Sequence, residues 1–143
     1  MKNFKNKVAA ITGAGSGIGQ QLALLLAKQG CHLALSDVNE QGLAQTLALL
    51  QDTPVRISTQ KLDVADREAM KQWAADTVTT HGAVNMIFNN AGVALSSTVE
   101  GTSYEELEWI VNIKFWGVVY GTKELLPLIK ATDFGHGSKI SSL

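Results

Sequence analysis

Four glycines occupy alternate positions of residues 13–19, a segment that lies between two very different stretches of sequence. Residues 8–12 (VAAIT) are apolar and rich in β-branched side chains, which predicts a strand. Residues 17–29 combine alanine and leucine with the apolar spacing of a helix. A glycine-rich backbone between them can turn tightly and approach another group closely. The sequence is therefore limited to folds in which a strand turns directly into a helix.

The same alternation of strand and helix continues along the chain, with glycine, asparagine or aspartate at most of the changes. The runs VAAIT, HLALS and VNMIF come close to being continuously apolar, as expected for strands that helices bury on both faces. The last predicted helix is expected to break near Asn112 and to kink or end at Pro127. The predicted strands are residues 8–12, 32–36, 55–61 and 84–89 with a weak fifth over 138–141, and the predicted helices are residues 17–29, 40–50, 66–80 and 103–129.

This order of elements predicts an α/β fold with a Rossmann-type doubly wound parallel sheet, truncated after about five strands. Right-handed crossover connections place helices on both faces of such a sheet. No internal repeat, low-complexity stretch or linker interrupts the sequence. We therefore expect residues 1–143 to form a single nucleotide-binding domain.

The glycine segment has the arrangement that binds a pyrophosphate in this fold. A helix that starts at the end of a parallel strand presents its free first-turn amides to whatever lies above the strand. Gly13 permits the turn, Gly17 lets the backbone approach the phosphates, and Gly19 removes the side chain that would separate helix and strand. Asp37 follows the second predicted strand about 20 residues later, as dinucleotide binding requires. We prefer this interpretation to an ordinary glycine loop.

Asp37 also bears on which dinucleotide binds. Its carboxylate can accept hydrogen bonds from both ribose hydroxyls of an adenosine, and its charge would repel a 2′-phosphate. Neither Ser16 nor Val38 supplies a cation for such a phosphate. NAD is therefore favoured over NADP. The alternative role for Asp37 is that of a helix cap, for which Asn39 is a competing candidate.

Four motifs in order resemble those of the short-chain dehydrogenase/reductase family. TGAGSGIG (residues 12–19) has the family's TGxxxGxG spacing, LDVAD (62–66) resembles the segment that flanks the adenine, and NNAG (89–92) resembles the motif that steadies the sheet and lines the cofactor site. ISSL (140–143) resembles the end of the fifth strand, where the second serine, here Ser142, is the catalytic one. The resemblance implies a cofactor site made of Gly13, Ser16, Gly17, Ile18, Gly19, Asp37, Asp63, Val64, Asn90, Ala91 and Gly92.

The resemblance further implies an NAD(P)-dependent oxidoreductase that transfers a hydride between nicotinamide and the carbon of an alcohol or carbonyl substrate. In the family a tyrosine exchanges the proton, a lysine four residues later lowers its pKa, and the serine hydroxyl binds the substrate oxygen. This pair is expected beyond Ser142, because neither Tyr104 nor Tyr120 has a lysine four residues later. We expect the chain to be the amino-terminal, cofactor-binding portion of such an enzyme, incomplete relative to the family.

Two departures from the family pattern keep other functions open. Lys114 occupies the position of the family's proton-relay asparagine, and Asn112 lies two residues earlier, about 200° away on a helix. Residues 135–142 are polar for a buried strand, so they form either an exposed edge or a disordered segment. A catalytically inactive nucleotide-binding module is therefore an alternative function. A methyltransferase of similar topology is a further alternative, against which the TGAGSGIG and NNAG motifs argue.

Composition narrows the classes of protein to consider. The formal net charge is -1, with 45% hydrophobic and 17% charged residues, which excludes a disordered tail and a strongly basic nucleic-acid binder. No apolar run approaches the roughly 20 residues of a membrane span. Only four apolar residues follow the basic start, too few for a signal peptide. We expect neither a nucleic-acid partner nor a membrane partner.

The remaining expectations concern cysteine, histidine and assembly. Cys31 is the single cysteine, so we expect a buried core residue rather than a disulfide, and a cytoplasmic location. His32, His81 and His136 lack metal-ligand spacing, so we expect no metal site. In the family, a helix equivalent to the one after Asn112 helps to bury a dimer interface. The resemblance therefore implies a homo-oligomer for a full-length protein.

Overall fold

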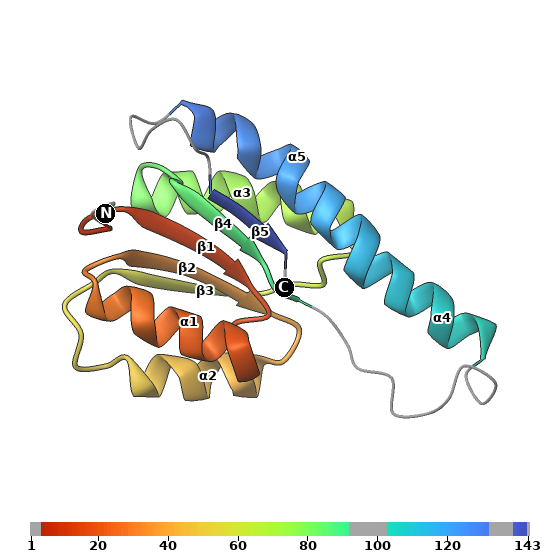
Figure 1. Ribbon diagram of the computed structural model, residues 1–143, viewed down its shortest axis with the longest axis horizontal. Coiled ribbons are helices and arrows are strands. Elements are labelled where there is room, and N and C mark those ends of the chain that lie inside the picture. The colour runs from red at the N-terminus through yellow and green to blue at the C-terminus, as the bar shows by residue number, and fades with distance from the viewer. Residues whose placement is uncertain (1–3, 92–102, 132–138, 143) are drawn as a thin grey trace.

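The structure is a computed structural model that describes residues 4–91, 103–131 and 139–142. Its strands are β1 (Val8–Thr12), β2 (His32–Asp37), β3 (Ile57–Lys61), β4 (Met86–Asn89) and β5 (Lys139–Ser142). They form one five-stranded parallel sheet in the order β3-β2-β1-β4-β5 (Figure 1). The chain thus extends the sheet from β1 first in one direction and then in the other. Ligands of open α/β sheets bind at the carboxyl ends of the strands beside this switch point.

The described helical segments are α1 (Gly17–Lys28), α2 (Glu40–Leu49), α3 (Arg67–His81), α4 (Tyr104–Val111), η1 (Asn112–Trp116) and α5 (Gly117–Lys130). Figure 1 shows α1 and α2 on one face of the sheet and α3 and α5 on the other. This arrangement confirms the predicted doubly wound α/β fold. α4 runs through η1 into α5 as one long helix that extends past the sheet (Figure 1).

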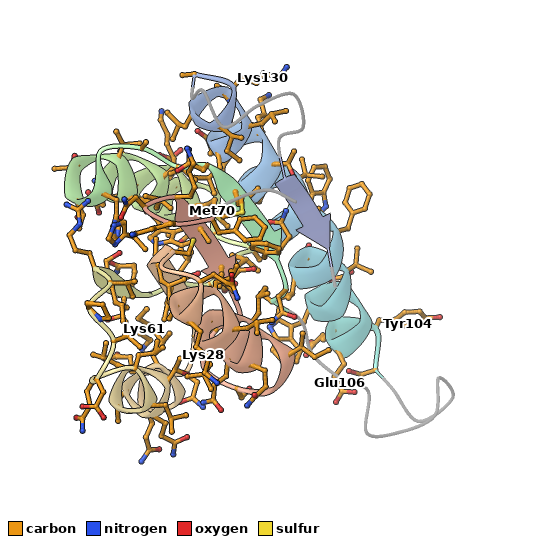
Figure 2. All side chains as sticks on the ribbon, turned by 60° about the vertical axis from the view of Figure 1, so that its left-hand side comes forward. Lys28, Lys61, Met70, Tyr104, Glu106 and Lys130 are labelled. Atoms are coloured by element: carbon orange, nitrogen blue, oxygen red, sulfur yellow. The ribbon has the colours of Figure 1, made fainter. Side chains whose placement is uncertain are left out.

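Two hydrophobic clusters, one on each face, hold the central strand β1. Side chains of successive strand residues point to opposite faces, and β1 is buried along its whole length. Ala9 and Ile11 belong to the cluster under α1 and α2, whereas Ala10 belongs to the cluster under α3 and α5. Met70 of α3 is fully buried in the second cluster, while Tyr104 of α4 projects outward (Figure 2). The end of β1, where the glycine segment begins, is therefore fixed from both sides.

Cys31 lies in the first of these clusters, as predicted. It is fully buried and forms no disulfide. Burial raises the pKa of its thiol to about 12, so the thiolate is disfavoured. Among the described residues, no helix is both long and apolar enough to cross a membrane.

The expected break near Asn112 is a change of helix type and not an end of the helix. The backbone stays right-handed helical at Asn112 and Gly117, and the five residues of η1 form a π-helical turn. Ile113 and Gly117, four residues apart and therefore on the same side of the helix, are both buried. The helix therefore passes from α4 to α5 without interruption.

The helix also does not end at Pro127. α5 continues to Lys130, and Leu125 and Ile129 are buried on either side of the proline. This burial holds the last turn against the sheet and compensates for the backbone hydrogen bond that proline cannot donate. The other predicted bounds differ from the structure by at most two residues.

β5 is present as the predicted fifth strand, and it lies at the end of the described sheet. It runs parallel to β4, with Lys139 opposite Met86 and Ser142 opposite Asn89. This favours the edge-strand alternative over disorder for these four residues. Residues 135–138 of the polar stretch lie outside the described residues.

Candidate functional site

The candidate site lies at the carboxyl edge of the sheet, where the ends of β1, β2 and β4 meet the start of α1 (Figure 1). Gly13 follows β1 with a φ of 67°, and Gly17 begins α1 with a φ of 55°. Both values lie in the left-handed region, which costs a residue with a Cβ roughly 1–2 kcal/mol. These two glycines make the tight turn between strand and helix that the sequence predicts.

The glycines of this turn differ in what surrounds them. A Cβ on Gly19 would collide with the carbonyl oxygen of Gly13 and with the side-chain amide of Asn90. A Cβ on Gly13 would lie 2.8 Å from the Cα of Ala91. A Cβ on Gly17 would meet no heavy atom of the described residues within 4 Å. Gly13 and Gly19 thus allow the backbone to pack closely, whereas the space in front of Gly17 is open to a ligand.

The start of α1 lacks the side-chain cap found on other helices. Ser16 is the N-cap residue, but its side chain makes no capping hydrogen bond, and the first turn contains no acidic residue. By contrast, the side chains of Asn39 and Asp66 cap α2 and α3. Ser16 and Ile18 are both exposed. The partial positive charge at the start of α1 is therefore available to an anion.

Asp37 stands at the end of β2 and is half-buried beside residues 13–19, which we call the glycine turn. One carboxylate oxygen, Oδ2, accepts a hydrogen bond from the backbone N–H of Gly15 at 2.8 Å, and Oδ1 accepts one from the backbone N–H of Asn39 at 3.0 Å. Asn39 caps α2 by accepting from the N–H of Gly42. The alternative that Asp37 is the cap is therefore wrong.

The end of β4 is tied to the glycine turn by three hydrogen bonds. The buried hydroxyl oxygen of Thr12 accepts from the backbone N–H groups of Asn90 and Ala91, each at 3.0 Å. The side-chain amide of Asn90 donates to the carbonyl oxygen of Gly13 at 3.1 Å. The structure thus brings Asn90 and Ala91 to the turn, while Gly92 lies outside the described residues.

Asp63 and Val64 follow β3, which pairs with β2. The backbone N–H of Leu62 donates to the carbonyl oxygen of Asp37 at 3.0 Å, so this segment leaves the sheet at the same edge. Asp63 is exposed and accepts from the N–H of Ala65 at 2.9 Å. The side chain of Val64 is buried in the cluster under α3 and α5. For Val64, the backbone is the part left to contact a ligand.

Comparison with known proteins agrees with this geometry. A family model described as short chain dehydrogenase matches residues 7–143. The chain belongs to the short-chain dehydrogenase family. It is 46% identical over 100% of its length to a Mycobacterium tuberculosis protein named "Putative oxidoreductase SadH", of which it covers 52%. At the level of the family, these proteins are oxidoreductases.

Two further proteins are also matched by this chain over about half of their length. The chain is 37% identical over 134 residues to cyclohexanol dehydrogenase of an Acinetobacter species, covering 92% of this chain and 53% of that protein. A short chain dehydrogenase/reductase from Burkholderia phymatum, solved in complex with NAD, matches with a TM-score of 0.91 and 30% identity over 99% of this chain and 50% of that one. The chain spans about half the length of the relatives it matches.

Two positions singled out by the family pattern lie in the second half of this short-chain dehydrogenase chain. Ser142 ends β5 opposite Asn89, at the carboxyl edge of the sheet. Lys114 lies within η1. Asn89 itself is buried, and its side-chain amide donates to the hydroxyl of Thr122 on α5 at 3.4 Å, while its Oδ1 has no hydrogen-bond partner among the described residues. Its close neighbour Gly121 leaves room for it, since a Cβ there would lie 2.5 Å from Oδ1.

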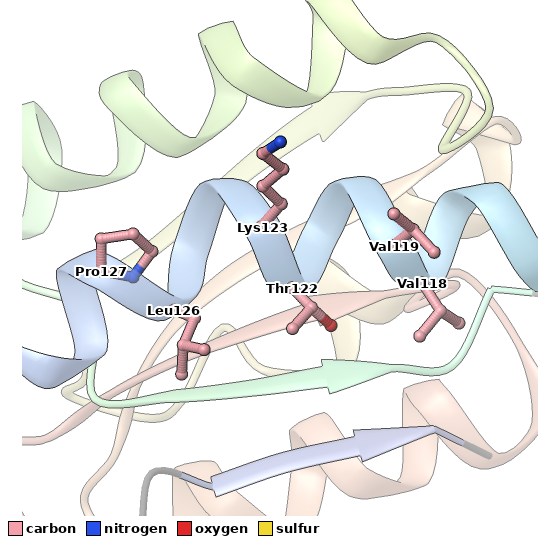
Figure 3. Close-up of a pocket in the computed structure, with 6 residues that line it drawn as sticks. All are labelled: Val118, Val119, Thr122, Lys123, Leu126 and Pro127. Atoms are coloured by element: carbon pink, nitrogen blue, oxygen red, sulfur yellow. The ribbon is translucent and has the colours of Figure 1, made fainter.

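A shallow apolar depression on α5 is separate from the glycine turn. Val118, Thr122 and Leu126 point from α5 towards β4 and β5, whereas Lys123 points the other way (Figure 3). No residue of the glycine turn lines this depression. It is therefore not part of the candidate cofactor site.

Sequence reasoning missed Thr12 and Thr46 as parts of the site. Thr12 is the first letter of the TGAGSGIG motif, which is a signal that could have found it. Thr46 sits in α2, and its hydroxyl contacts the glycine turn at Ala14. Nothing in the local sequence around Thr46 marks this contact, because it forms between segments 32 residues apart.

Proposed function

We propose that this chain binds NAD at the carboxyl edge of the sheet, as the cofactor-binding portion of an oxidoreductase that acts on an alcohol or carbonyl substrate. The observation that carries the proposal is the open turn at the start of α1. Gly17 has a positive φ and open space in front of it, and the helix behind it has no side-chain cap. No packing within the described residues explains this choice of residues, whereas a bound pyrophosphate does.

The residues around the turn fit the parts of a dinucleotide. The first-turn amides at Gly17 and Ile18, with the hydroxyl of Ser16, would hold the pyrophosphate. Asp37 would accept from the adenosine ribose, and the segment Asp63 to Val64 would flank the adenine. Asn90, Ala91 and Gly92 would line the nicotinamide half, with Gly13 and Gly19 keeping the backbone close. When bound, the nicotinamide supplies the hydride donor or acceptor, and the Ser142 hydroxyl would bind the substrate oxygen.

The charges at the ribose end support NAD over NADP. Lys61 lies opposite Asp37 in the pairing of β3 with β2. Its ammonium group is 3.6 Å from a carboxylate oxygen of Glu40, and both side chains are largely exposed. The three groups together carry a net charge of -1, so a 2′-phosphate meets net repulsion.

Titration of the protein with NADH and with NADPH, followed by nicotinamide fluorescence, tests this proposal. We expect NADH to bind more tightly. Equal or tighter binding of NADPH would overturn the preference, and binding of neither would overturn the proposal as a whole. S-adenosylmethionine serves as a further probe, since its binding in place of NADH would favour the methyltransferase alternative.

We also propose a cytoplasmic, homo-oligomeric enzyme with a small-molecule substrate. The buried single cysteine supports a reducing compartment. Trp109, Phe115 and Trp116 are 52%, 56% and 43% exposed on one long helix, which supports association of this surface. Sedimentation of the intact protein tests the oligomer, and a monomer at micromolar concentration would contradict it.

A nucleotide-binding module without chemistry is the second candidate. Lys114, at the position of the family's asparagine, favours it. This candidate predicts NADH binding with no turnover across a panel of alcohols and ketones by the intact protein. Turnover of any of these substrates would exclude this candidate. A higher turnover in a Lys114→Asn variant would show that the lysine lowers the activity.

A further inference from the structure

The glycine turn is held from behind by a threonine of α2. The hydroxyl of Thr46 lies 2.8 Å from the carbonyl oxygen of Ala14 and 3.2 Å from that of Gly42. A hydroxyl has one proton to donate, and the shorter distance assigns it to Ala14. Thr46 is fully buried, so this hydrogen bond is shielded from water.

The same hydroxyl links three segments of the chain. The side-chain amide of Gln20, in α1, donates to the Thr46 oxygen at 3.0 Å. Gly42, one turn before Thr46, lies against the turn, because a Cβ there would be 2.6 Å from the carbonyl oxygen of Gly15. α2 therefore supports the inner side of the turn, whose outer side at Gly17 is open.

The peptide unit between Ala14 and Gly15 is fixed at both ends. Its carbonyl oxygen accepts from Thr46, and its N–H donates to Oδ2 of Asp37 at 2.8 Å. Because a peptide unit is planar, the direction of its carbonyl sets the direction of its N–H. The orientation of the Asp37 carboxylate is thereby coupled to the Thr46 hydroxyl through one peptide plane.

We propose that Thr46, assisted by Gln20, is a positioning residue for cofactor selection: it orients the Ala14–Gly15 peptide and, through it, the carboxylate of Asp37. This inference rests on the proposed binding of NAD. A peptide held in the bound orientation spares the cost of ordering it when the dinucleotide binds. Loss of the Thr46 hydroxyl frees the peptide to rotate and lets the Asp37 carboxylate turn away from the ribose.

A Thr46→Val variant of the intact protein tests the inference by titration with NADH and NADPH. Loss of one buried hydrogen bond predicts NADH affinity lower by roughly 3- to 10-fold. NADPH affinity should fall less, because the carboxylate that repels its 2′-phosphate is no longer held in place. The ratio of the two affinities therefore moves towards NADPH, and a Thr46→Ser variant restores it.

Thr77 provides a matched control on α3. It is also a buried helical threonine, and its hydroxyl donates to the carbonyl oxygen of Trp73 at 2.7 Å. Thr77→Val should lower the thermal stability about as much as Thr46→Val while leaving both dinucleotide affinities unchanged. If Thr46→Val fails to fold, the half-buried Gln20→Met variant tests the same link, with NADH affinity expected to fall about 2-fold.

The outcomes separate this inference from the function on which it rests. Wild-type protein that binds NADH, together with a Thr46→Val affinity ratio equal to that of Thr77→Val, would overturn the inference and leave the proposed function intact. Wild-type protein that binds neither dinucleotide would overturn both. A folded Gln20→Met variant with unchanged affinities, where Thr46→Val does not fold, would likewise overturn the inference.

Discussion

The helices α1 and α3 both follow a strand of the same parallel sheet, yet they begin in opposite ways. α3 starts with Asp66, whose side chain accepts from the N–H of Ala69 at 3.1 Å, and Glu68 adds a second negative charge in its first turn. α1 starts with Ser16, which makes no side-chain cap, and with glycines in place of acids. A side-chain cap is worth about 1 kcal/mol. α1 forgoes this stabilisation, and its start is left free for an anion.

The start of α3 is thus built for stability, whereas the start of α1 is left open for the anion that we propose binds there. A carboxylate at the start of a helix satisfies the free amides and stabilises the dipole, but it also occupies the place of a phosphate. The contrast between α1 and α3 can therefore be tested by adding an acidic N-cap to α1 and by removing the acidic N-cap of α3.

The largest expected effect is that of Gly19→Ala in α1. The new methyl group would collide with the Gly13 carbonyl and the Asn90 side chain, so the unfolding free energy should fall by about 3 kcal/mol and NADH binding should be lost. The control is Gly82, which follows α3 with a φ of 83° and whose Cβ position has no atom of the described residues within 4 Å. Gly82→Ala should cost about 1 kcal/mol through its backbone alone and should keep NADH binding. Chemical denaturation and NADH titration measure both quantities, and full binding by Gly19→Ala would contradict the packing argument.

A Ser16→Asp substitution gives α1 the start that α3 has. The new carboxylate can accept from a first-turn amide, so the unfolding free energy should rise by about 0.5 kcal/mol. NADH affinity should fall on the order of 100-fold, because the carboxylate repels the pyrophosphate at close range. In the reverse experiment, Asp66→Ala should lower stability by about 1 kcal/mol without changing NADH affinity. Equal NADH affinity in Ser16→Asp and wild type would show that no phosphate binds at this helix.

The sequence predicted the glycine turn at the start of α1 but not the contacts that support it from α2. The strand, the turn and the roles of Gly13, Gly17 and Gly19 follow from local chemistry, since only glycine tolerates that backbone and that packing. The links from Thr46 to Ala14 and Gln20 join segments 32 and 26 residues apart, and they depend on which helices the sheet places side by side. No local pattern of residues announces such a link.

The helices in the second half of the chain were harder to predict, again because contacts between distant segments decide the outcome. Asn112 and Pro127 are both poor helix formers by local rules. The helix continues through them because Ile113, Leu125 and Ile129 are buried against the sheet and against α3. Tertiary packing outweighed local preference there, and periodicity alone does not show how strong that packing is.

Cofactor choice gives a smaller, more specific test at the ribose end. Replacing Asp37 by alanine and Val38 by arginine removes the repulsion against a 2′-phosphate and adds a cation for it. The ratio of NADPH to NADH affinity should rise about 10-fold or more. Val38 is exposed, so its replacement alone should leave stability unchanged. An unchanged ratio in the double variant would mean that the ribose does not bind at Asp37.

The smallest expected effect concerns His81, the last residue of α3, at the opposite end of that helix from Asp66. His81 is buried. One ring nitrogen lies 2.9 Å from the Ser58 hydroxyl, and the other has no partner in the described part of the chain. Burial, and then the positive charge of Arg56, lower the pKa of His81 from its usual 6.5. The unfolded chain therefore binds a proton below about pH 6.5 that the folded chain resists, so stability is full above this pH and is lost as the pH falls through it.

The free energy of unfolding lost through His81 cannot exceed about 1.4 kcal/mol per pH unit, because a single proton is involved. Urea unfolding of wild type and of His81→Gln between about pH 7.5 and 5.5 measures it, and the variant should show the shallower decline. His32, whose pKa is also lowered but which is less buried, is the control, and His32→Gln should change the slope less. Identical slopes in wild type and His81→Gln would show that the end of α3, unlike its start, contributes no charge-dependent stability.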